Sequence, residues 1–255
     1  MNDFSYFVSS FLDLSGIDLN LYKEKQMKRR ISTFVNRHGY KTYAEFLDVL
    51  NRNKDLYAEF LRYITINVTE FFRNPEQWNI LRNSIIPLLY TNKKYIKIWS
   101  CACSSGEEVY SLQFILSDLE VRYELLATDI DNNELKKAHE AVYDFRQIKN
   151  IDTNLLERYF IKLDNNKYRV KDSFKQNIKF DTFNLLRDGY PKNFDLILCR
   201  NVLIYFTEEA KNFVLTNLSN SLNKGGILFV GNTEQIIFPQ NYGLEAYKTF
   251  FYRKL

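Results

Sequence analysis

Arg200 and Asn201 carry the clearest chemical signal in this chain of 255 residues. They directly follow the largely apolar run at 194–199, which predicts a buried strand. Ligands of open α/β sheets bind beyond the carboxyl ends of the strands, so a guanidinium and an amide at this point indicate a ligand site rather than packing. Tyr205 follows in the same segment. Taken alone, a tyrosine there is more typical of a core position than of a catalyst.

A second polar loop, 104–108, follows the apolar run at 95–101. It has only Gly106 where a dinucleotide-binding loop has three glycines, and Glu107 and Glu108 stand where a pyrophosphate would bind. Because phosphates seek helix N-termini free of negative charge, the loop disfavours NAD and nucleoside triphosphates. S-adenosylmethionine, with a sulfonium, an ammonium and no phosphate, fits better. Alternatively, the two carboxylates only stabilise the dipole of the next helix.

Two further strand ends carry polar groups. Asp129 ends the predicted second strand, where an acid commonly holds ribose hydroxyls. The alternative role is the cap of the next helix, for which Asp131 is the better candidate. Asn184 and Leu185 follow the run at 178–183 and could meet the edge and the face of an adenine, although asparagine is also common in turns.

These groups require strands that end at one edge of a sheet. Alternating apolar and helical segments over 75–255 predict an α/β fold with a doubly wound, mostly parallel sheet. The predicted strands are 95–101, 123–128, 178–183, 194–199, 227–231 and 249–253, and the predicted helices are 76–90, 107–119, 132–141 and 208–222. Residues 142–177 interrupt this order and predict an inserted β-hairpin subdomain, with a helix at 152–160 and a hairpin turning at 164–166.

Residues 1–74 predict a small all-α domain ahead of the sheet domain at 75–255. Its expected helices are 4–14, a second one capped by Asp18 and ending near Arg37, 42–50 and 54–65.

Composition excludes several classes of function. The three cysteines lack the spacing of a disulfide framework, and with only two histidines, His38 and His139, we expect no metal site. A net charge of +4 is small for a nucleic-acid binder. The sequence shows neither a signal peptide nor an apolar run of membrane-spanning length, so a cytoplasmic, monomeric protein without membrane insertion is expected.

Several ordered segments resemble the motifs of the CheR family of chemotaxis receptor methyltransferases. They are INVTEFFR (66–73), WSCACSSGEEVYS (99–111), ATDID (127–131), FNLL (183–186), FDLILCRNVLIYF (194–206) and GGILFVGNTE (225–234). Each segment is weak evidence alone, but their order and spacing together are highly specific.

The resemblance implies a Rossmann-like class I fold and methyl transfer from S-adenosylmethionine to glutamate side chains of chemoreceptors, leaving S-adenosylhomocysteine. It assigns cofactor contacts to Asn67, Thr69, Arg73, Glu108, Asp129, Asn184, Leu185, Arg200 and Asn201. Arg73 and Tyr205 match residues proposed to line the reacting centre, and so are the expected catalytic pair. A glutamate is already ionised at neutral pH, so the reaction needs no general base.

The chain departs from the family pattern at two places. Cys101, Cys103 and Ser105 stand where the family often has alanines and a threonine, which are small-for-small changes. The segment 231–234 reads Gly-Asn-Thr-Glu where the family usually has Gly-His-Ser-Glu, so no role that needs this histidine carries over.

The predicted partners are the cytoplasmic methylation helices of chemoreceptors. Lys23, Arg30 and Arg37 recur every seven residues and form one basic stripe on the second helix, which suits acidic receptor helices. The alternative is a solvated face. The hairpin loop at 162–167 lacks glycine and is short, so we expect no binding of a receptor tail peptide there.

Two other functions stay open at this stage. One is methylation of another protein, a small molecule or a nucleic acid, and the other is a non-catalytic module that senses the cofactor.

Overall fold

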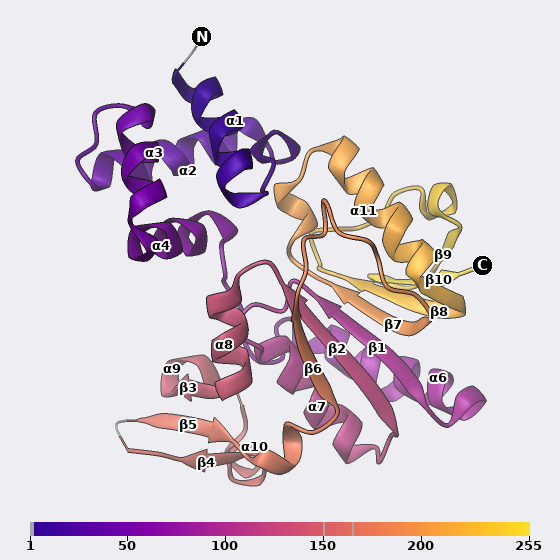
Figure 1. Cartoon of the computed structure of the whole chain (residues 1–255). Helices are drawn as coiled ribbons and strands as arrows, with labels where there is room; N and C mark the ends of the chain where they lie inside the picture. Colours follow the sequence, from indigo (N-terminus) through magenta and orange to yellow (C-terminus); the bar gives the residue numbers. More distant parts are fainter. Residues whose placement is uncertain (1–2, 150, 165) are drawn as a thin grey trace. The chain divides into compact units, whose positions relative to one another are not determined.

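The computed structural model describes residues 3–149, 151–164 and 166–255 (Figure 1). Contacts divide the chain into two units. The first holds the residues up to Asn67 together with Ile204–Val214, and the second holds Val68–Leu203 and Leu215–Leu255. In the described part of the chain, no helix is long and apolar enough to cross a membrane.

The first unit is a helical domain with an aromatic core. Its helices are α1 (Asp3–Ser15), α2 (Glu24–Arg37), α3 (Tyr43–Arg52) and α4 (Lys54–Thr65). Thr42 and Asn53 cap α3 and α4 through their side-chain oxygens. Phe7, Phe46 and Phe60 are fully buried, with Phe46 and Phe60 edge to face at 5.0 Å between ring centroids.

One helix start in this unit was predicted wrongly. Asp18 caps a short 3₁₀ turn at Leu19–Leu21 instead of the second helix, and α2 begins only at Glu24. The Asp18 carboxylate accepts from the amide of Asn20, a local bond that ends after one turn.

The segment 204–214 joins the first unit through backbone pairing with the start of α2. The amide of Lys23 donates to the carbonyl of Tyr205 at 2.9 Å, and that of Thr207 donates to Leu21 at the same distance. Tyr22 and Phe206 form a β-bridge with their rings edge to face. A strand-end segment that is distant in sequence is therefore tied to the helical domain.

The second unit contains a seven-stranded sheet in the order β6-β2-β1-β7-β8-β10-β9. The strands are β1 (Ile96–Cys101), β2 (Tyr123–Asp129), β6 (Ile178–Thr182), β7 (Phe194–Cys199), β8 (Leu222–Val230), β9 (Leu244–Lys248) and β10 (Phe251–Lys254). The first five in sheet order are parallel, and β10 is antiparallel to both neighbours. This is the predicted doubly wound, mostly parallel α/β fold.

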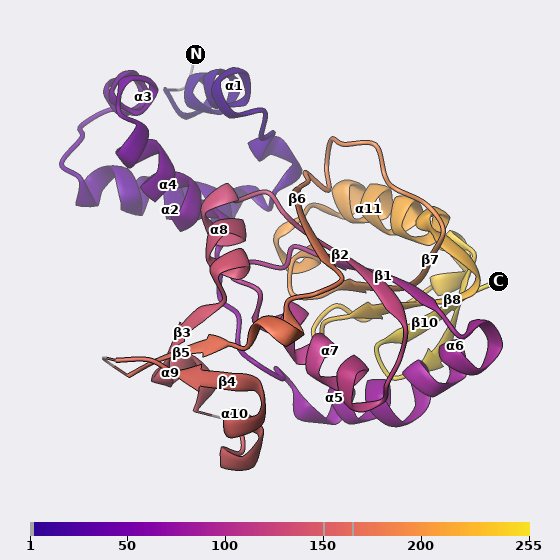
Figure 2. The same cartoon turned by 60° about the horizontal axis from the view of Figure 1, so that its bottom comes forward.

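Helices cover the sheet on both faces. On one face lie α5 (Pro75–Ile80), α6 (Ile86–Lys93) and α7 (Glu107–Asp118), and on the other lies the part of α11 (Glu208–Ser221) that belongs to this unit (Figure 2). Helix α8 (Asn132–Glu140) connects β2 to the inserted segment. The single helix predicted at 76–90 is interrupted by a π turn at Leu81–Ile85, because Pro87 has no amide hydrogen to continue the α pattern.

The end of the sheet was predicted incompletely. Strand β8 begins at Leu222, earlier than predicted, and β9 was missed altogether. β9 follows a 3₁₀ turn at Pro239–Tyr242 and pairs with β10 at the edge of the sheet, so its alternating burial depends on a single neighbouring strand.

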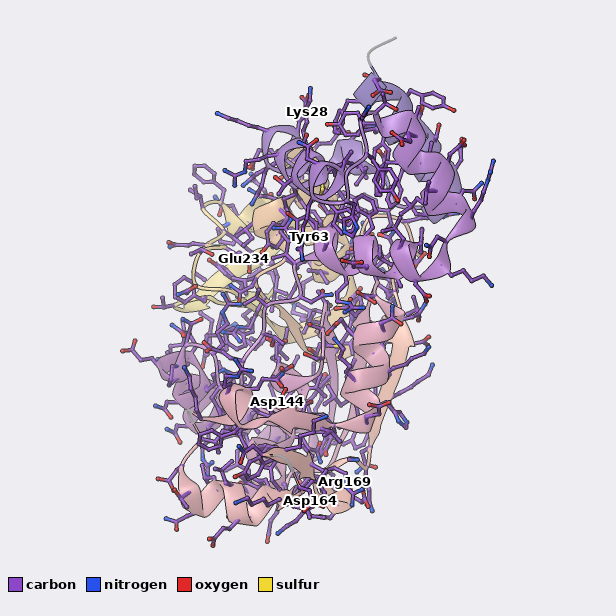
Figure 3. All side chains as sticks on the ribbon, turned by 90° about the vertical axis from the view of Figure 1, so that its left-hand side faces the viewer. Lys28, Tyr63, Asp144, Asp164, Arg169 and Glu234 are labelled. Carbon is purple, nitrogen blue, oxygen red and sulfur yellow. The ribbon has the colours of Figure 1, made fainter. Side chains whose placement is uncertain are left out.

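The inserted segment forms a three-stranded sheet in the order β3-β5-β4. It comprises β3 (Val142–Asp144), α9 (Phe145–Ile148), α10 (Thr153–Tyr159), β4 (Phe160–Lys162) and β5 (Lys167–Val170); Asp144, Asp164 and Arg169 are labelled on it in Figure 3. The predicted hairpin is confirmed as β4-β5, while β3 and α9 were missed. Asn165 in the predicted turn lies outside the described residues.

Aromatic rings attach this inserted subdomain to α7 and to the segment that precedes α5. Tyr159 stacks on Phe114 at 4.0 Å between centroids, and Phe71 meets Tyr143 edge to face at 4.9 Å. All four side chains are almost fully buried. The subdomain is thus a packed part of the second unit and not a loose appendage.

Candidate functional site

The polar groups predicted at strand ends come together at one edge of the sheet. The parallel register pairs Cys101 of β1 with Thr128 of β2 and with Cys199 of β7. It also pairs Asp129 with Thr182, and Cys199 with Val230. The loops that follow these strands therefore start at the same level, as the position of a ligand site in an open α/β sheet requires.

The loop after β1 has a strained backbone. Ala102, Ser104 and Gly106 all have positive φ angles, of 56°, 49° and 91°. A Cβ atom on Gly106 would lie 2.9 Å from the Cβ of Ala138, so the single glycine of this loop is required both by its φ angle and by its close contact with α8. Such strain persists only where the surroundings hold the backbone in place.

Asp129 holds this loop from the side of β2. Its Oδ2 accepts from the amide of Ser104 at 2.7 Å, and its Oδ1 accepts from the amide of Asp131 at 2.9 Å. Asp131 is the cap of α8, as predicted. Asp129 is 5% exposed, and burial raises its pKa to about 6. Because burial destabilises the charged carboxylate, any further hydrogen-bond donor on a ligand would stabilise it.

The two neighbouring glutamates at the start of α7 face different partners. Glu107 is fully buried, accepts from Ser105 Oγ and Gln147 Nε2 at 2.7 Å each, and has its pKa raised by burial. Glu108 instead accepts from Ser100 Oγ at 2.9 Å and from Arg200 Nη1 at 3.1 Å. Only Glu108 therefore belongs to the same cluster as Arg200.

Arg200 is a structural centre of the site. Its side chain is 2% exposed, and its guanidinium lies over the ring of Phe229 at 4.5 Å. Nη1 binds Glu108, and Nη2 donates to the carbonyl of Arg73 at 2.9 Å. Its two terminal nitrogens thus bind protein groups, so Arg200 positions Glu108 and the segment around Arg73, while its Nε is buried without a hydrogen-bond partner among the residues that the structure describes. Direct contact of Arg200 with the cofactor stays a prediction.

Asn201 and the end of β8 are joined by a carboxylate that the sequence analysis did not single out. Glu234 Oε2 accepts from the amides of Asn201 and Gly231, at 2.6 and 2.8 Å. Asn201 has a φ of 61°, and a Cβ atom on Gly231 would lie 2.9 Å from its amide nitrogen. The sequence feature that could have predicted this role of Glu234 is the Gly-Asn-Thr-Glu turn at a strand end, because a carboxylate there can accept hydrogen bonds from strand-end amides.

The remaining predicted residues of the second unit are Thr69, Arg73, Asn184 and Leu185. Arg73 is half-buried, and its Nη1 donates to the carbonyl of Val68 at 3.1 Å. Asn184 Oδ1 accepts from the amide of Leu186, so its side chain forms the turn that was its alternative role. Leu185 is buried, and Thr69 is half-buried.

The other five predicted site residues belong to the first unit. Asn67 and Tyr205 are both half-buried and belong to this unit. Lys23 is the exposed residue before α2, and Arg37 is exposed at its end. Arg30, by contrast, donates to the carbonyl of Tyr63 and lies over its ring at 4.6 Å. Arg30 therefore stabilises the helical domain, and the exposed cations of the stripe are Lys23 and Arg37.

Comparison with known proteins decides the family. The model for the all-alpha domain of CheR methyltransferases matches residues 2–65, and the model for their SAM binding domain matches 67–250. The chain belongs to the CheR methyltransferase family. A chemotaxis protein methyltransferase of Listeria innocua is 42% identical over 99% of this chain and 97% of its own length. One from Borreliella burgdorferi is 32% identical over 94% of this chain and 89% of its own length.

Membership of this family makes S-adenosylmethionine the cofactor, and the residues present fit it. The hydroxyl of Ser104 is buried at the strained loop without a hydrogen-bond partner in the protein. A buried orphan hydroxyl is costly unless a ligand satisfies it. Asp129, Glu108 and Asn201 offer carboxylates and an amide at the same sheet edge, which suits a ligand with hydroxyls and two cationic centres. Within the described ranges, no cluster of His, Cys, Asp or Glu suits a metal.

Cofactor affinity should depend on pH through Asp129. Its pKa of about 6 means that it is largely protonated at pH 5 and ionised at pH 7.5. Hydroxyl donors of the ribose favour the ionised form and lower that pKa, so by linkage affinity rises as pH increases through 6. We expect the Kd for S-adenosylhomocysteine, measured by calorimetry, to fall about fivefold between pH 5 and 7.5 for a shift of about one pKa unit. Asp129→Asn should bind more weakly at pH 7.5 and show a flat profile; a flat wild-type profile contradicts the assignment.

Proposed function

We propose that this enzyme transfers methyl groups from S-adenosylmethionine to glutamate carboxylates of chemoreceptor helices, forming methyl esters in chemotaxis. The relatives carry the name of chemotaxis protein methyltransferases, which supports a receptor as substrate. The observation that carries the proposal is the set of polar side chains at the sheet edge, which consists of carboxylates, amides and an arginine. Both histidines lie elsewhere, one at the C-cap of α2 and the other in α8. A site without a histidine base suits a nucleophile that is already an anion.

The protein's task is then alignment and exclusion of water. When bound, S-adenosylmethionine supplies an electrophilic methyl group on a sulfonium. Arg73 holds the incoming carboxylate by charge-assisted hydrogen bonds, with its own backbone fixed by Arg200 and by Trp78 Nε1 at 2.9 Å. Tyr205 stays a predicted second contact of that carboxylate. Charge disappears as the ester forms, so firm neutralisation of the carboxylate would lower its reactivity, and orientation matters more than tight binding.

The direct test is incorporation of a labelled methyl group into receptor cytoplasmic fragments. Methyl esters of glutamate are released as methanol by mild base, whereas methylated nitrogen is stable. We expect base-labile label at glutamates, lost when those glutamates are replaced by alanine. Base-stable label, or label only in small molecules or nucleic acid, would point to another substrate.

The basic stripe of α2 should govern receptor docking. We expect the paired change Lys23→Glu and Arg37→Glu to raise the KM for receptor about tenfold at low salt, with the difference shrinking as salt screens the charges. Arg30 is left in place because it binds Tyr63. The control is Arg52→Glu with Lys54→Glu, which makes the same charge change on exposed positions of α3 and α4. Equal effects of the two pairs would reduce the stripe to a contribution of net charge.

The proposal places the enzyme in the cytoplasm as a monomer, where receptor methylation helices are accessible. That the loop at 162–167 binds no receptor tail peptide stays a prediction, which titration with such a peptide would test.

A further inference from the structure

The strained loop after β1 is held by the inserted subdomain as well as by the main sheet. We propose that this subdomain positions the cofactor loop, and that Tyr143 and Gln147 are positioning residues for S-adenosylmethionine binding. Asp129 fixes one side of the loop through the amide of Ser104. Tyr143 and Gln147 fix the other side, and neither residue belongs to the strand ends that form the cofactor site.

Tyr143 reaches the loop from β3. Its side chain is buried, and its hydroxyl donates to the carbonyl of Ser105 at 2.8 Å. A Cβ atom on Gly106 would lie 3.2 Å from that hydroxyl, so the tyrosine is in close contact with the backbone of the loop. Burial raises the pKa of Tyr143 far above its usual range, so the hydroxyl stays a donor at all working pH values.

Gln147 reaches the end of the loop from α9. Its Nε2 donates to Glu107 Oε1 at 2.7 Å, while its Oε1 accepts from the amide of Asp144 at 3.0 Å. The same side chain therefore caps α9 and binds the first residue of α7. Glu107 also accepts from Ser105 Oγ, so Gln147 and Tyr143 act on both ends of the Ser105–Glu107 segment.

The contacts of Tyr143 and Gln147 hold a loop whose backbone conformation is strained. The left-handed conformations of Ala102 and Ser104 make the loop costly on its own, and strained backbone persists only when the surroundings over-determine it. The same loop carries the unpartnered hydroxyl of Ser104. If the loop is loosened, part of the binding free energy of the cofactor is spent on ordering the loop. The affinity for the cofactor then falls although no cofactor contact is removed.

The test compares buried tyrosines of the same subdomain. Tyr143→Phe removes the bond to the loop, and Gln147→Met removes both bonds of Gln147 with little change in volume. Tyr159→Phe is the matched control: its hydroxyl donates to Asp118 at 2.6 Å, at the other end of α7. For each variant, calorimetry gives the Kd for S-adenosylhomocysteine, and hydrogen exchange without cofactor gives the protection of the amides of 104–107.

We expect Tyr143→Phe and Gln147→Met each to raise this Kd about fivefold, because each variant loses one hydrogen bond to the 105–107 segment, and to speed exchange at 104–107. In the receptor assay, the KM for S-adenosylmethionine should rise with kcat retained at saturating cofactor. Tyr159→Phe should change melting temperature by a similar amount but leave Kd and loop exchange as in the wild type. Unchanged Kd in the Tyr143 and Gln147 variants, or an equal rise in the Tyr159 variant, overturns the proposal. Calorimetry and exchange need no substrate, so they remain decisive if the proposed receptor substrate is wrong.

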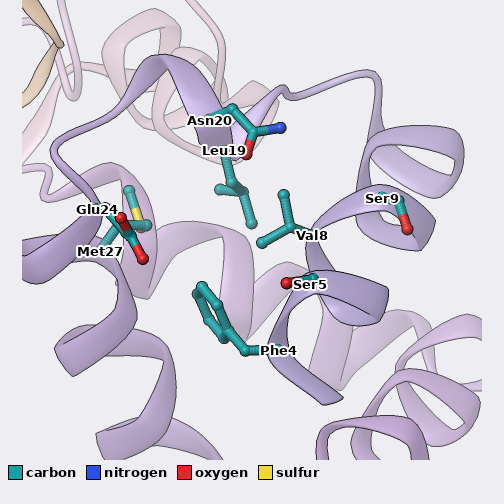
Figure 4. Close-up of a pocket in the computed structure, with 8 residues that line it drawn as sticks. All are labelled: Phe4, Ser5, Val8, Ser9, Leu19, Asn20, Glu24 and Met27. Carbon is teal, nitrogen blue, oxygen red and sulfur yellow. The ribbon is translucent and has the colours of Figure 1, made fainter. Parts of the chain in front are cut away.

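The helical domain also holds a cavity of about 230 Å³ between α1, the 3₁₀ turn and α2, lined by Phe4, Ser5, Val8, Ser9, Leu19, Asn20, Glu24 and Met27 (Figure 4). Nothing in the described part of the chain indicates what would fill this cavity.

Discussion

Replacing Arg200 with methionine should lower the free energy of unfolding by about 3–5 kcal/mol, the cost of leaving one member of a buried ion pair unpaired. Glu108 is 12% exposed, and among the described residues its cationic partner is the Nη1 of Arg200. The change also removes the hydrogen bond from Arg200 to the carbonyl of Arg73 and the contact of its guanidinium with the ring of Phe229. Urea denaturation monitored by tryptophan fluorescence and by circular dichroism would measure the effect.

Arg82→Met is the matched control for this prediction. Arg82 pairs with Asp118 at 3.0 Å, but its side chain is 41% exposed, and Asp118 keeps Arg158 and Tyr159 as partners. We expect it to cost less than about 1 kcal/mol. Glu108→Gln in the Arg200→Met background should recover part of the loss, because it removes the unpaired charge. Equal losses for Arg200→Met and Arg82→Met would show that burial adds nothing to the Arg200–Glu108 pair.

Replacing Arg73 with alanine should lower kcat/KM for receptor methylation about 100-fold, or about 2.7 kcal/mol of transition-state stabilisation. The reason is the loss of the charge-assisted hydrogen bonds that are proposed to orient the substrate carboxylate. The structure makes this variant informative, because the carbonyl of Arg73 keeps its bonds to Arg200 and Trp78 when the side chain is removed. Stability should therefore change little, as denaturation would verify.

Arg73→Lys separates charge from geometry. A lysine keeps the positive charge but cannot bind a carboxylate with two parallel hydrogen bonds, so we expect an intermediate rate. The Kd for S-adenosylhomocysteine should change far less than the rate in both variants. Wild-type turnover in Arg73→Ala would remove Arg73 from the reacting centre, and a Kd change as large as the rate change would make it a cofactor contact alone.

Much of the fold was predictable because its signals are local. Alternating apolar runs and helical segments marked the parallel core, and Pro75 marked the start of α5. The missed strands, β3 and β9, are short and lie at sheet edges, and β3 pairs with a strand more distant in sequence. The start of α2 was misplaced because Asp18 satisfies a local turn just as well as a helix.

In the candidate site, too, some features were predictable from local sequence signals and others depended on tertiary contacts. Residue types at strand ends predicted that Asp129, Asn201 and the Glu107–Glu108 pair lie at one edge of the sheet, because parallel strands bring consecutive loops together there; the family resemblance chose Glu108. Other roles depended on side-chain direction. Glu107 and Glu108 are neighbours in sequence, yet one turns toward Gln147 and the other toward Arg200. No spacing rule distinguishes them before α7 is placed against both the sheet and the inserted subdomain.

The sequence by itself determined the family, the cofactor class and the edge of the sheet at which the site lies, because ordered motifs and strand periodicity are properties of the chain alone. Only the tertiary structure decided that Arg200 is consumed by Glu108 and Arg73, that Arg30 belongs to the packing of the helical domain, and that Tyr143 and Gln147 reach the cofactor loop. The physical reason is that a charged or polar side chain acquires its role from the partners that remain when water is excluded. Those partners come from elements that folding alone brings together.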